Sequence, residues 1–279
     1  MLRLTGVQAG AVRIEARAPA GTLLAWPNPP PLMGLEVTGI ETRHIDVLGE
    51  AASDFGAQHA WVARVSGPAP SITLRYSEAV TFAPDWAWTP PDVALNRPST
   101  ELVALAREIT SGLEGQTRVY AIMRHVSSVF HYGHGEGRFT DDALAVPALT
   151  CGLTRGSCVD IHTYAVAALH ASGIDAAYCA GVFWRDGLTT FEDMHCWIIV
   201  GGDTPSVWDI SHDLIASRDV APNFDSVSGR RFPLALGRSV SYSWGGATWQ
   251  FSHFAKPHVL TPDGGHAFPA DTVFTVVSG

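Results

Sequence analysis

Apolar and polar residues alternate in short runs over the first 83 residues of the chain. An alternation of period two places successive side chains on opposite faces of the backbone, as in a half-buried β-strand. Turn-forming residues interrupt these runs, notably at 26–31 (Trp-Pro-Asn-Pro-Pro-Pro) and at Gly67-Pro68. The pattern predicts strands at Val12/Ile14/Ala16, Leu35/Val37, 44–47, Ala60/Val62/Val65 and Ile72/Leu74/Tyr76.

Residues 85–98 carry no usable periodicity. The stretch 84–98 is PDWAWTPPDVALNRP and contains four prolines and two tryptophans. Prolines stiffen a connection, and tryptophans in such a stretch are expected to pack on a domain rather than to bind a ligand. We therefore predict an ordered linker whose Trp86 and Trp88 dock onto the folded chain.

A helical period begins at residue 99. Ser99 is a candidate N-cap for a first helix that ends near Gly112, and a second helix follows it. A third helix is predicted after Ser157, because Ser157 and Asp160 match the capping box and Gly173 can end the helix. The apolar positions of the three helices are Leu102, Val103, Leu105, Ala106 and Ile109; Val119, Ile122, Met123, Val126, Val129 and Phe130; and Val159, Ile161, Ala165, Val166 and Leu169.

Strand patterns return after the third helix. They lie at 174–184, 194–200 and 205–210, and shorter ones lie at 239–243, 248–251 and 272–277. Strands and helices in separate runs are typical of an α+β protein. We therefore divide the chain into a β-sandwich-like, β-rich module at 1–84, a linker at 85–98 and a second domain at 99–279.

The composition argues against several kinds of binding partner, cellular location and cysteine site. The 279 residues carry 18 basic and 27 acidic side chains, a net charge of −9, without a Lys/Arg cluster, so we expect neither nucleic acid nor a membrane as partner. No apolar run is long enough to span a bilayer, and the N-terminal residues lack the apolar core of a secretory signal, which predicts a cytoplasmic protein. Four cysteines without a CxxC pair indicate neither a zinc knuckle nor a disulfide scaffold.

The candidate chemistry concentrates at residues 155–160, Arg-Gly-Ser-Cys-Val-Asp. Cys158 would be the first residue of the third helix, where unsatisfied N–H groups and the positive end of the helix dipole favour a thiolate. Arg155 in the preceding turn would add positive charge. Because a single cysteine is more often a buried structural residue, the interpretation of Cys158 as a nucleophile depends on partners elsewhere.

Two later residues are candidates for those partners. In the strand at 194–200, alternation puts His195 and Trp197 on one face and Cys196, expected to be a small buried residue, on the other. Asp209 follows the next strand, and an antiparallel pairing of the two strands would bring its carboxylate to the imidazole of His195. Cys158, His195 and Asp209 would then serve as nucleophile, base and orienting acid.

Two residues of the third helix compete for roles in this site. His162 lies one turn beyond Cys158 and is a rival base, but a rigid i, i+4 neighbour offers no obvious carboxylate partner. We therefore expect His162 to line the substrate pocket, together with Trp197. Asp160 is expected to be a helix cap and not an acid catalyst.

Three further possibilities concern the loops before Cys158. The oxyanion hole should contain the backbone N–H of Cys158, with Tyr132 as the candidate side-chain donor. Cys151 is near enough in sequence to form a regulatory disulfide. A metal site at His131, His134 and Asp141 or Asp142 is chemically feasible, but the glycines of this loop do not preorganise ligands, and we expect no metal and no cofactor.

Four segments, in this order and spacing, resemble those of the bacterial transglutaminase-like cysteine hydrolases. They are 156–160 (Gly-Ser-Cys-Val-Asp for G-x-C-x-D), 173–178 (Gly-Ile-Asp-Ala-Ala-Tyr for G-I-x-A-R-Y), 195–197 (His-Cys-Trp for H-A-W) and 208–209 (Trp-Asp for W-x-x-x-D). The resemblance covers about residues 95–215. Residues 1–84 also look like the β-rich region that often precedes this domain. Ala177 stands where the family often has Arg, and Cys196 where it usually has a small residue.

The resemblance implies a fold and an activity. The fold would be a papain-like transglutaminase core in which the helix of the nucleophile packs on an antiparallel sheet. The triad would be Cys158, His195 and Asp209, without a metal or cofactor. The implied function is hydrolysis of a peptide or carboxamide bond in a peptide or protein substrate, through a thioester. Acyl transfer to an amine and a non-catalytic peptide-binding or assembly module are the alternatives.

Overall fold

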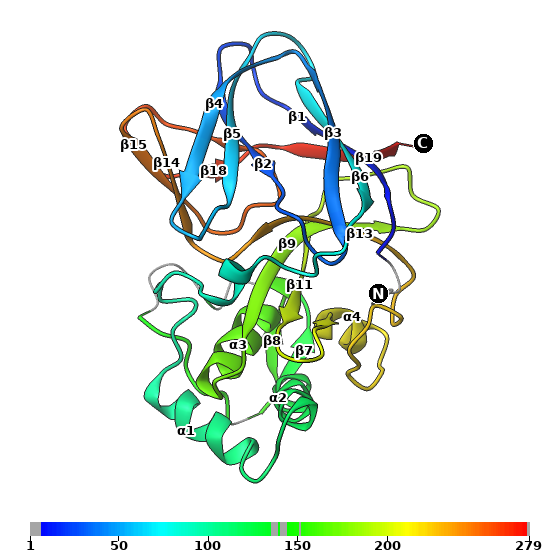
Figure 1. Ribbon diagram of the computed structural model, residues 1–279, viewed down its shortest axis with the longest axis vertical. Coiled ribbons are helices and arrows are strands. Elements are labelled where there is room, and N and C mark those ends of the chain that lie inside the picture. Colours follow the sequence, from blue (N-terminus) through cyan, green and yellow to red (C-terminus); the bar gives the residue numbers. More distant parts are fainter. Residues whose placement is uncertain (1–6, 135–138, 140–143, 151, 278–279) are drawn as a thin grey trace. The chain divides into compact units, whose positions relative to one another are not determined.

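The chain folds into two compact units that alternate along the sequence (Figure 1). The computed structural model describes residues 7–134, 139, 144–150 and 152–277. Unit 1 combines 1–89, 180–195 and 229–279, and unit 2 combines 90–179 and 196–228. The class is α+β, as predicted, and the described residues contain more strand than helix. The sequence-based division at 84 and 99 remains a prediction about folding domains, because the compact units join segments that are far apart in the chain.

Unit 1 contains two large sheets. The first is antiparallel and has the order β10 (Thr190–Phe191), β19 (Thr272–Val277), β1 (Gly10–Ala16), β6 (Ser71–Glu78) and β3 (Leu35–Arg43). The second has the order β17 (Gly265–His266), β15 (Ala247–Phe251), β14 (Val240–Trp244), β4 (Ile45–Ser53), β5 (His59–Val65), β2 (Leu23–Asn28), β16 (His258–Val259) and β18 (Phe268–Pro269). Strand β13 (Gly229–Leu236) also belongs to unit 1.

The C-terminal residues complete the sheets begun by the N-terminal ones. The short strands predicted at 239–243, 248–251 and 272–277 are confirmed as β14, β15 and β19. Strand β19 pairs with β1, β14 with β4, and β16 with β2. Strand patterns in sequence specify which face is buried but not which strand is the neighbour, so this tail could not be placed before the structure was known.

The interpretation of residues 26–31 as a turn is wrong for its first half. Strand β2 continues through Trp26 and Pro27 to Asn28, with Pro27 opposite Ala60 of β5. A proline has no backbone N–H to donate to a neighbouring strand. It is therefore tolerated in a sheet where the strand is unpaired on one side. The other neighbour, β16, reaches only Leu24 and Ala25, which leaves Pro27 outside that ladder.

The segment predicted to be a linker contains one short helix. Residues Asp85–Trp88 form the 3-10 helix η1. The Trp86 ring packs edge-on against Phe55, with ring centroids 5.3 Å apart. This contact confirms that Trp86 docks onto the β-rich part of the chain.

Unit 2 contains four described helices, α1 (Thr100–Ile109), α2 (Gln116–Val129), α3 (Cys158–Ala171) and α4 (Ile210–Ile215). The predicted cap is present, because the Ser99 side chain accepts a hydrogen bond from the Leu102 N–H. Phe130 does not extend α2 but begins β7, and it is still buried. Helix α3 packs against α1, α2 and α4, and a helix that is apolar on all sides is expected to be enclosed in this way.

The strands of unit 2 are few and short. Strands β7 (Phe130–Tyr132) and β8 (Thr154–Gly156) pair in parallel. Strand β11 (His195–Val200) pairs antiparallel with β12 (Ser206–Trp208) and has β9 (Ala176–Arg185) on its other side. Both β9 and β11 have residues in each unit. The strand predicted at 205–210 is shorter than expected because Asp209 caps α4. Within the described residues, no helix has the length and apolarity needed to cross a bilayer.

A half-buried histidine, His253, and a buried one, His258, make unit 1 sensitive to acid. Burial lowers the pKa of His253 to about 3, with the charges of Arg238, His258 and Lys256 adding to the effect. Burial also lowers the pKa of His258 to about 4, although its hydrogen bond to the Lys256 carbonyl opposes this shift. The unfolded chain binds protons at both histidines below about pH 6.5, whereas the folded unit does not until the pH is much lower. Stability is therefore lost as the pH falls below about 6.5.

We expect His258→Phe to reduce this acid sensitivity, because phenylalanine does not titrate and preserves the stacking of His258 on Phe251. Between pH 6.5 and 5 each buried histidine should cost about 1–2 kcal/mol of unfolding free energy. Urea unfolding at the two pH values measures the loss. The exposed His266→Gln is the matched control, and an equal loss in His258→Phe and wild type would refute the prediction.

Candidate active site

Cys158 is the first residue of α3, at the position predicted for it. Its side chain is buried, with 6% of the residue exposed. The capping box predicted for Ser157 and Asp160 is present. The Asp160 Oδ2 accepts hydrogen bonds from the Ser157 N–H at 3.0 Å and from its hydroxyl at 2.9 Å. Asp160 is therefore a helix cap, and it fixes the turn that presents Cys158.

Asp209 is a buried carboxylate between β12 and α4, with 1% of the residue exposed. Its Oδ1 accepts hydrogen bonds from the Ser211 hydroxyl at 2.8 Å and from the His212 N–H at 3.2 Å. Its Oδ2 lies 2.9 Å from Nδ1 of His212. Sequence analysis missed both the helix and His212 as a partner. The signal in the sequence was an aspartate, a favoured N-cap residue, three positions before His212. At that spacing the aspartate side chain can accept a hydrogen bond from the His212 N–H and start a helix.

The argument that His162 has no carboxylate partner is wrong. His162 is fully buried on α3, and its Nε2 lies 3.8 Å from Oδ1 of Asp209. The distance is longer than a hydrogen bond, and the two groups form an ion pair only when His162 is protonated. Sequence reasoning considered only neighbours on the same helix, whereas the carboxylate comes from the start of α4.

Cys196 is buried, as predicted, but it belongs to the same cluster as the nucleophile. Its Sγ lies 3.4 Å from Nδ1 of His162, and its thiol is close enough to that of Cys158 for the two to interact. Burial raises the pKa of the Cys196 thiol well above its usual value, and the interaction with Cys158 raises it further. The residue expected only to fill space is thus a second thiol in contact with the first.

His195 begins strand β11 and is buried, with 8% of the residue exposed. The centroid of its ring lies 5.7 Å from the centroid of the Phe183 ring. The antiparallel pairing expected for its strand is confirmed, with Ile198 of β11 opposite Trp208 of β12. Asp209 therefore follows β12 at the end of the ladder where β11 begins. The role of His195 as base remains a prediction.

Tyr132 lies on the strand that leads away from α2. In the parallel ladder of β7 and β8, Tyr132 is opposite Gly156, two residues before Cys158. Its hydroxyl lies 3.2 Å from Nε2 of His134. The ladder thus brings Tyr132 to the chain segment from which α3 starts, and its use as an oxyanion donor stays a prediction.

Trp197 is fully buried, and its ring packs edge-on against Phe224 at a centroid distance of 6.0 Å. This is a core contact, and its predicted contact with substrate stays untested. Of the residues considered for a metal, His131 and His134 are exposed. Asp141 and Asp142 lie outside the described residues, as does Cys151.

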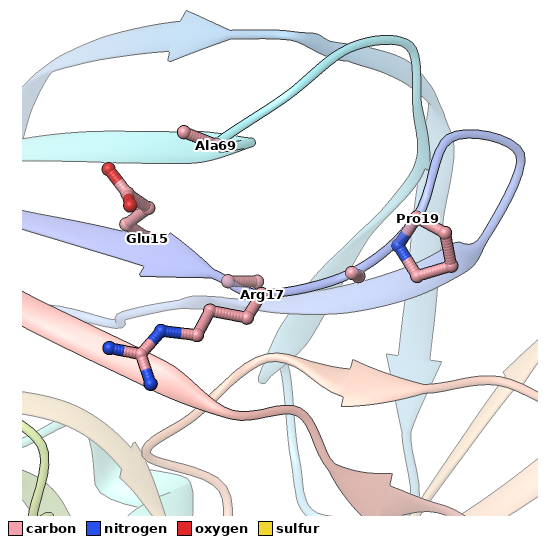
Figure 2. Close-up of a pocket in the computed structure, with 6 residues that line it drawn as sticks. Glu15, Arg17, Pro19 and Ala69 are labelled. Atoms are coloured by element: carbon pink, nitrogen blue, oxygen red, sulfur yellow. The ribbon is translucent and has the colours of Figure 1, made fainter.

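A surface hollow elsewhere in the chain does not compete with this cluster. Figure 2 shows it in unit 1, with Glu15, Arg17, Pro19 and Ala69 around it. Arg17 already pairs with Glu192 at 3.0 Å, and both side chains are more than half exposed. An exposed pair of this kind contributes little, and the hollow offers no nucleophile or buried base.

The middle of the sequence matches a known family. The model of the transglutaminase-like superfamily matches residues 103–203. The resemblance inferred from the four segments is thus confirmed for this part of the chain. The match includes Cys158 and His195, and Asp209 lies six residues beyond its end. It supports a cysteine-type hydrolase or acyltransferase. No curated protein matches the chain.

Solved structures show distant similarity. A candidate cysteine protease from Cytophaga hutchinsonii is 13% identical, with a TM-score of 0.49 and coverage of 97% of this chain and 98% of that chain. The periplasmic domain of TgpA from Pseudomonas aeruginosa is 16% identical, with a TM-score of 0.41 and coverage of 76% of this chain and 90% of that chain. Similarity at this level identifies no activity.

We predict that a thiol-directed electrophile labels Cys158 much faster than Cys179 or Cys196 near neutral pH. The helix N-terminus favours the thiolate at Cys158, whereas burial raises the pKa of both other thiols well above the usual value. Intact mass and peptide mapping over time give the rates. Cys158→Ala should remove the fast phase and Cys179→Ala should not. Equal rates at all cysteines would exclude an activated nucleophile.

Proposed function

We propose that this protein hydrolyses a peptide or carboxamide bond in a peptide or protein substrate through a thioester on Cys158. His195 acts first as base and then as acid, and Asp209 orients the imidazole. The observation that carries the proposal is the buried cluster of unit 2 in which Cys158 starts a capped helix beside the Cys196 thiol, with the His162 imidazole and the Asp209 carboxylate behind it. The family match over 103–203 supports thiol chemistry in the same segment.

The chemistry follows from these groups. The base removes the proton of the Cys158 thiol, and the thiolate attacks the carbonyl carbon of the substrate. As the tetrahedral intermediate collapses, the imidazolium gives its proton to the leaving amine and a thioester remains. Water, deprotonated by the same imidazole, then attacks the thioester, which releases the acid and restores the thiol.

The negative charge of the intermediate needs donors. The backbone N–H of Cys158 belongs to the first turn of α3, where no carbonyl within the helix accepts it. We assign this N–H as an oxyanion donor because it lies at the start of the helix, in a turn that the capping box fixes. Tyr132 is the proposed side-chain donor, since its strand lies beside the one that leads into α3.

Two histidines compete for the role of base. His195 is favoured by its place in the His-Cys-Trp segment and by the strand pairing, which puts Asp209 at its end of the ladder. His162 has Nδ1 3.4 Å from the Cys196 sulfur and Nε2 3.8 Å from Oδ1 of Asp209. A ring that lies between the Cys196 thiol and the Asp209 carboxylate can hold both groups in place. In hydrolysis we therefore assign His162 a positioning role.

A hydrolase and a transferase differ in the molecule that takes the acyl group from the thioester, which is water in the first and an amine in the second. An efficient crosslinking enzyme binds an amine beside the thioester, so that a high effective concentration lets it compete with water. The nearest acidic residues in sequence to His195 are Glu192 and Asp193, and Glu192 is paired with Arg17. This acidic pair is a poor site for gathering lysine amines, which supports water as acceptor.

We therefore predict that free acid is the main product from a cleavable peptide or amide, even with a large excess of glycine amide or cadaverine. Mass spectrometry of the products gives the partition directly. Cys158→Ala serves as the inactive control. An amine adduct as the main product at modest amine concentration would establish acyl transfer instead, and binding without turnover of any substrate would favour the peptide-binding module.

A second prediction concerns Asp209→Asn. Asparagine can still accept the hydrogen bonds that cap α4, but it removes the charge that orients and stabilises the imidazolium. Turnover should fall by a factor on the order of 10³–10⁴, as the same exchange does in a serine-protease triad, while the thermal midpoint changes little. The exposed Asp219→Asn is the matched control. Wild-type turnover in Asp209→Asn would remove Asp209 from the mechanism.

A further inference from the structure

We propose that Cys196 is a resolving thiol for Cys158, so that oxidation by hydrogen peroxide or another hydroperoxide converts the two into an intramolecular disulfide. The inference concerns regulation of the site proposed above and rests on Cys158 being its nucleophile. It assigns a covalent modification to a residue that the hydrolytic steps do not use.

The first observation is the contact between two thiols from different elements. Cys158 begins α3 and Cys196 is the second residue of β11. His162 lies one turn after Cys158 on α3, and its Nδ1 is 3.4 Å from the Cys196 sulfur, so the helix turn that carries Cys158 packs on Cys196. The two thiols are close enough to interact electrostatically, and the two residues are 6% and 0% exposed. Both are thiols in this structure. A nucleophile with a second thiol in contact is arranged as in proteins that form a disulfide on oxidation.

The second observation is the base beside Cys196. A buried thiol attacks poorly unless it loses its proton, and Nδ1 of His162 lies 3.4 Å from the Cys196 sulfur. Nε2 of the same ring lies 3.8 Å from Oδ1 of Asp209. The carboxylate stabilises the imidazolium that forms when His162 accepts the proton. Cys196, His162 and Asp209 thus form a proton-transfer chain of their own.

The third observation concerns specificity for this pair. Cys179 is also fully buried, and burial alone raises the pKa of its thiol. By contrast, the environment of the Cys196 thiol includes both Cys158 and Asp209. Among the residues that the structure describes, Cys196 is therefore the cysteine placed to react with an oxidised Cys158.

The steps balance with peroxide as the oxidant. The Cys158 thiolate attacks one peroxide oxygen, the O–O bond breaks, and hydroxide leaves, so Cys158 becomes a sulfenic acid while the peroxide is reduced. His162 takes the proton of Cys196, and the Cys196 sulfur then attacks the Cys158 sulfur. The S–O bond breaks, and the hydroxide that leaves is protonated to water. The disulfide removes the nucleophile, and a dithiol restores it.

The test is disulfide mapping of the full chain. Reduced protein is treated with stoichiometric hydrogen peroxide, blocked with iodoacetamide and digested without reductant. We expect a linked peptide pair containing Cys158 and Cys196, lighter by two hydrogens than the sum of its parts and separated by dithiothreitol. Cys179→Ser, the matched control, should give the same pair. A Cys158 to Cys151 pair, or a stable sulfenic acid on wild-type Cys158, would overturn the proposal.

Variants separate the roles of the two partners. In Cys196→Ser, a dimedone adduct on Cys158 should replace the disulfide, because no second sulfur is present to attack the sulfenic acid. In His162→Gln, disulfide formation should slow severalfold and should speed up again as the pH rises, since hydroxide then deprotonates Cys196. A rate in His162→Gln equal to wild type at every pH would exclude His162 as the base for Cys196.

The outcomes also distinguish this proposal from the proposed function. Fast alkylation of Cys158 without a disulfide to Cys196 would refute the resolving role alone. A disulfide in a protein whose reduced form hydrolyses no amide would refute the hydrolase and leave the thiol pair standing. No alkylation, dimedone adduct or disulfide at Cys158 would refute both.

Discussion

The burial of the Asp209 carboxylate is the constraint on which the rest of the site depends. A buried charge is costly unless hydrogen bonds and opposite charge compensate it. Here the Ser211 hydroxyl, the His212 N–H and the His212 ring provide that compensation. The same contacts start α4 at the end of β12. The Asp209 carboxylate thus marks the end of the strand and lies beside the imidazoles of His212 and His162.

Helix α3 provides the second fixed point. Its start is set by Asp160, which accepts two hydrogen bonds from Ser157. Its sides are covered by other helices and by β11. A buried, capped helix cannot shift its first residue without losing these contacts. The position of Cys158 is therefore as well determined as the core of unit 2.

The proposed function and the proposed disulfide together give the site two chemical states, a reduced one and an oxidised one. In the reduced state Cys158 has the helix N-terminus to favour its thiolate. Cys196 is its neighbour, and His162 links Cys196 to Asp209. Under these proposals the Asp209 carboxylate serves two imidazoles, that of His195 in hydrolysis and that of His162 beside Cys196. Loss of the Asp209 charge should consequently affect both turnover and resolution, whereas loss of Cys196 affects resolution directly.

Local sequence determined much of this protein. The capping box placed Cys158 at the start of α3, period-two alternation located the strands of unit 1, and the segments around Cys158 and His195 indicated the family, because these features depend on residues near one another in the chain. Only the tertiary structure showed that 229–279 completes the N-terminal sheets, that Asp209 reaches His162, and that Cys196 contacts Cys158. These three findings join residues that are far apart in the chain, so they depend on the order of the strands and on how the helices pack against them. A periodic pattern specifies which face is buried but not what covers it.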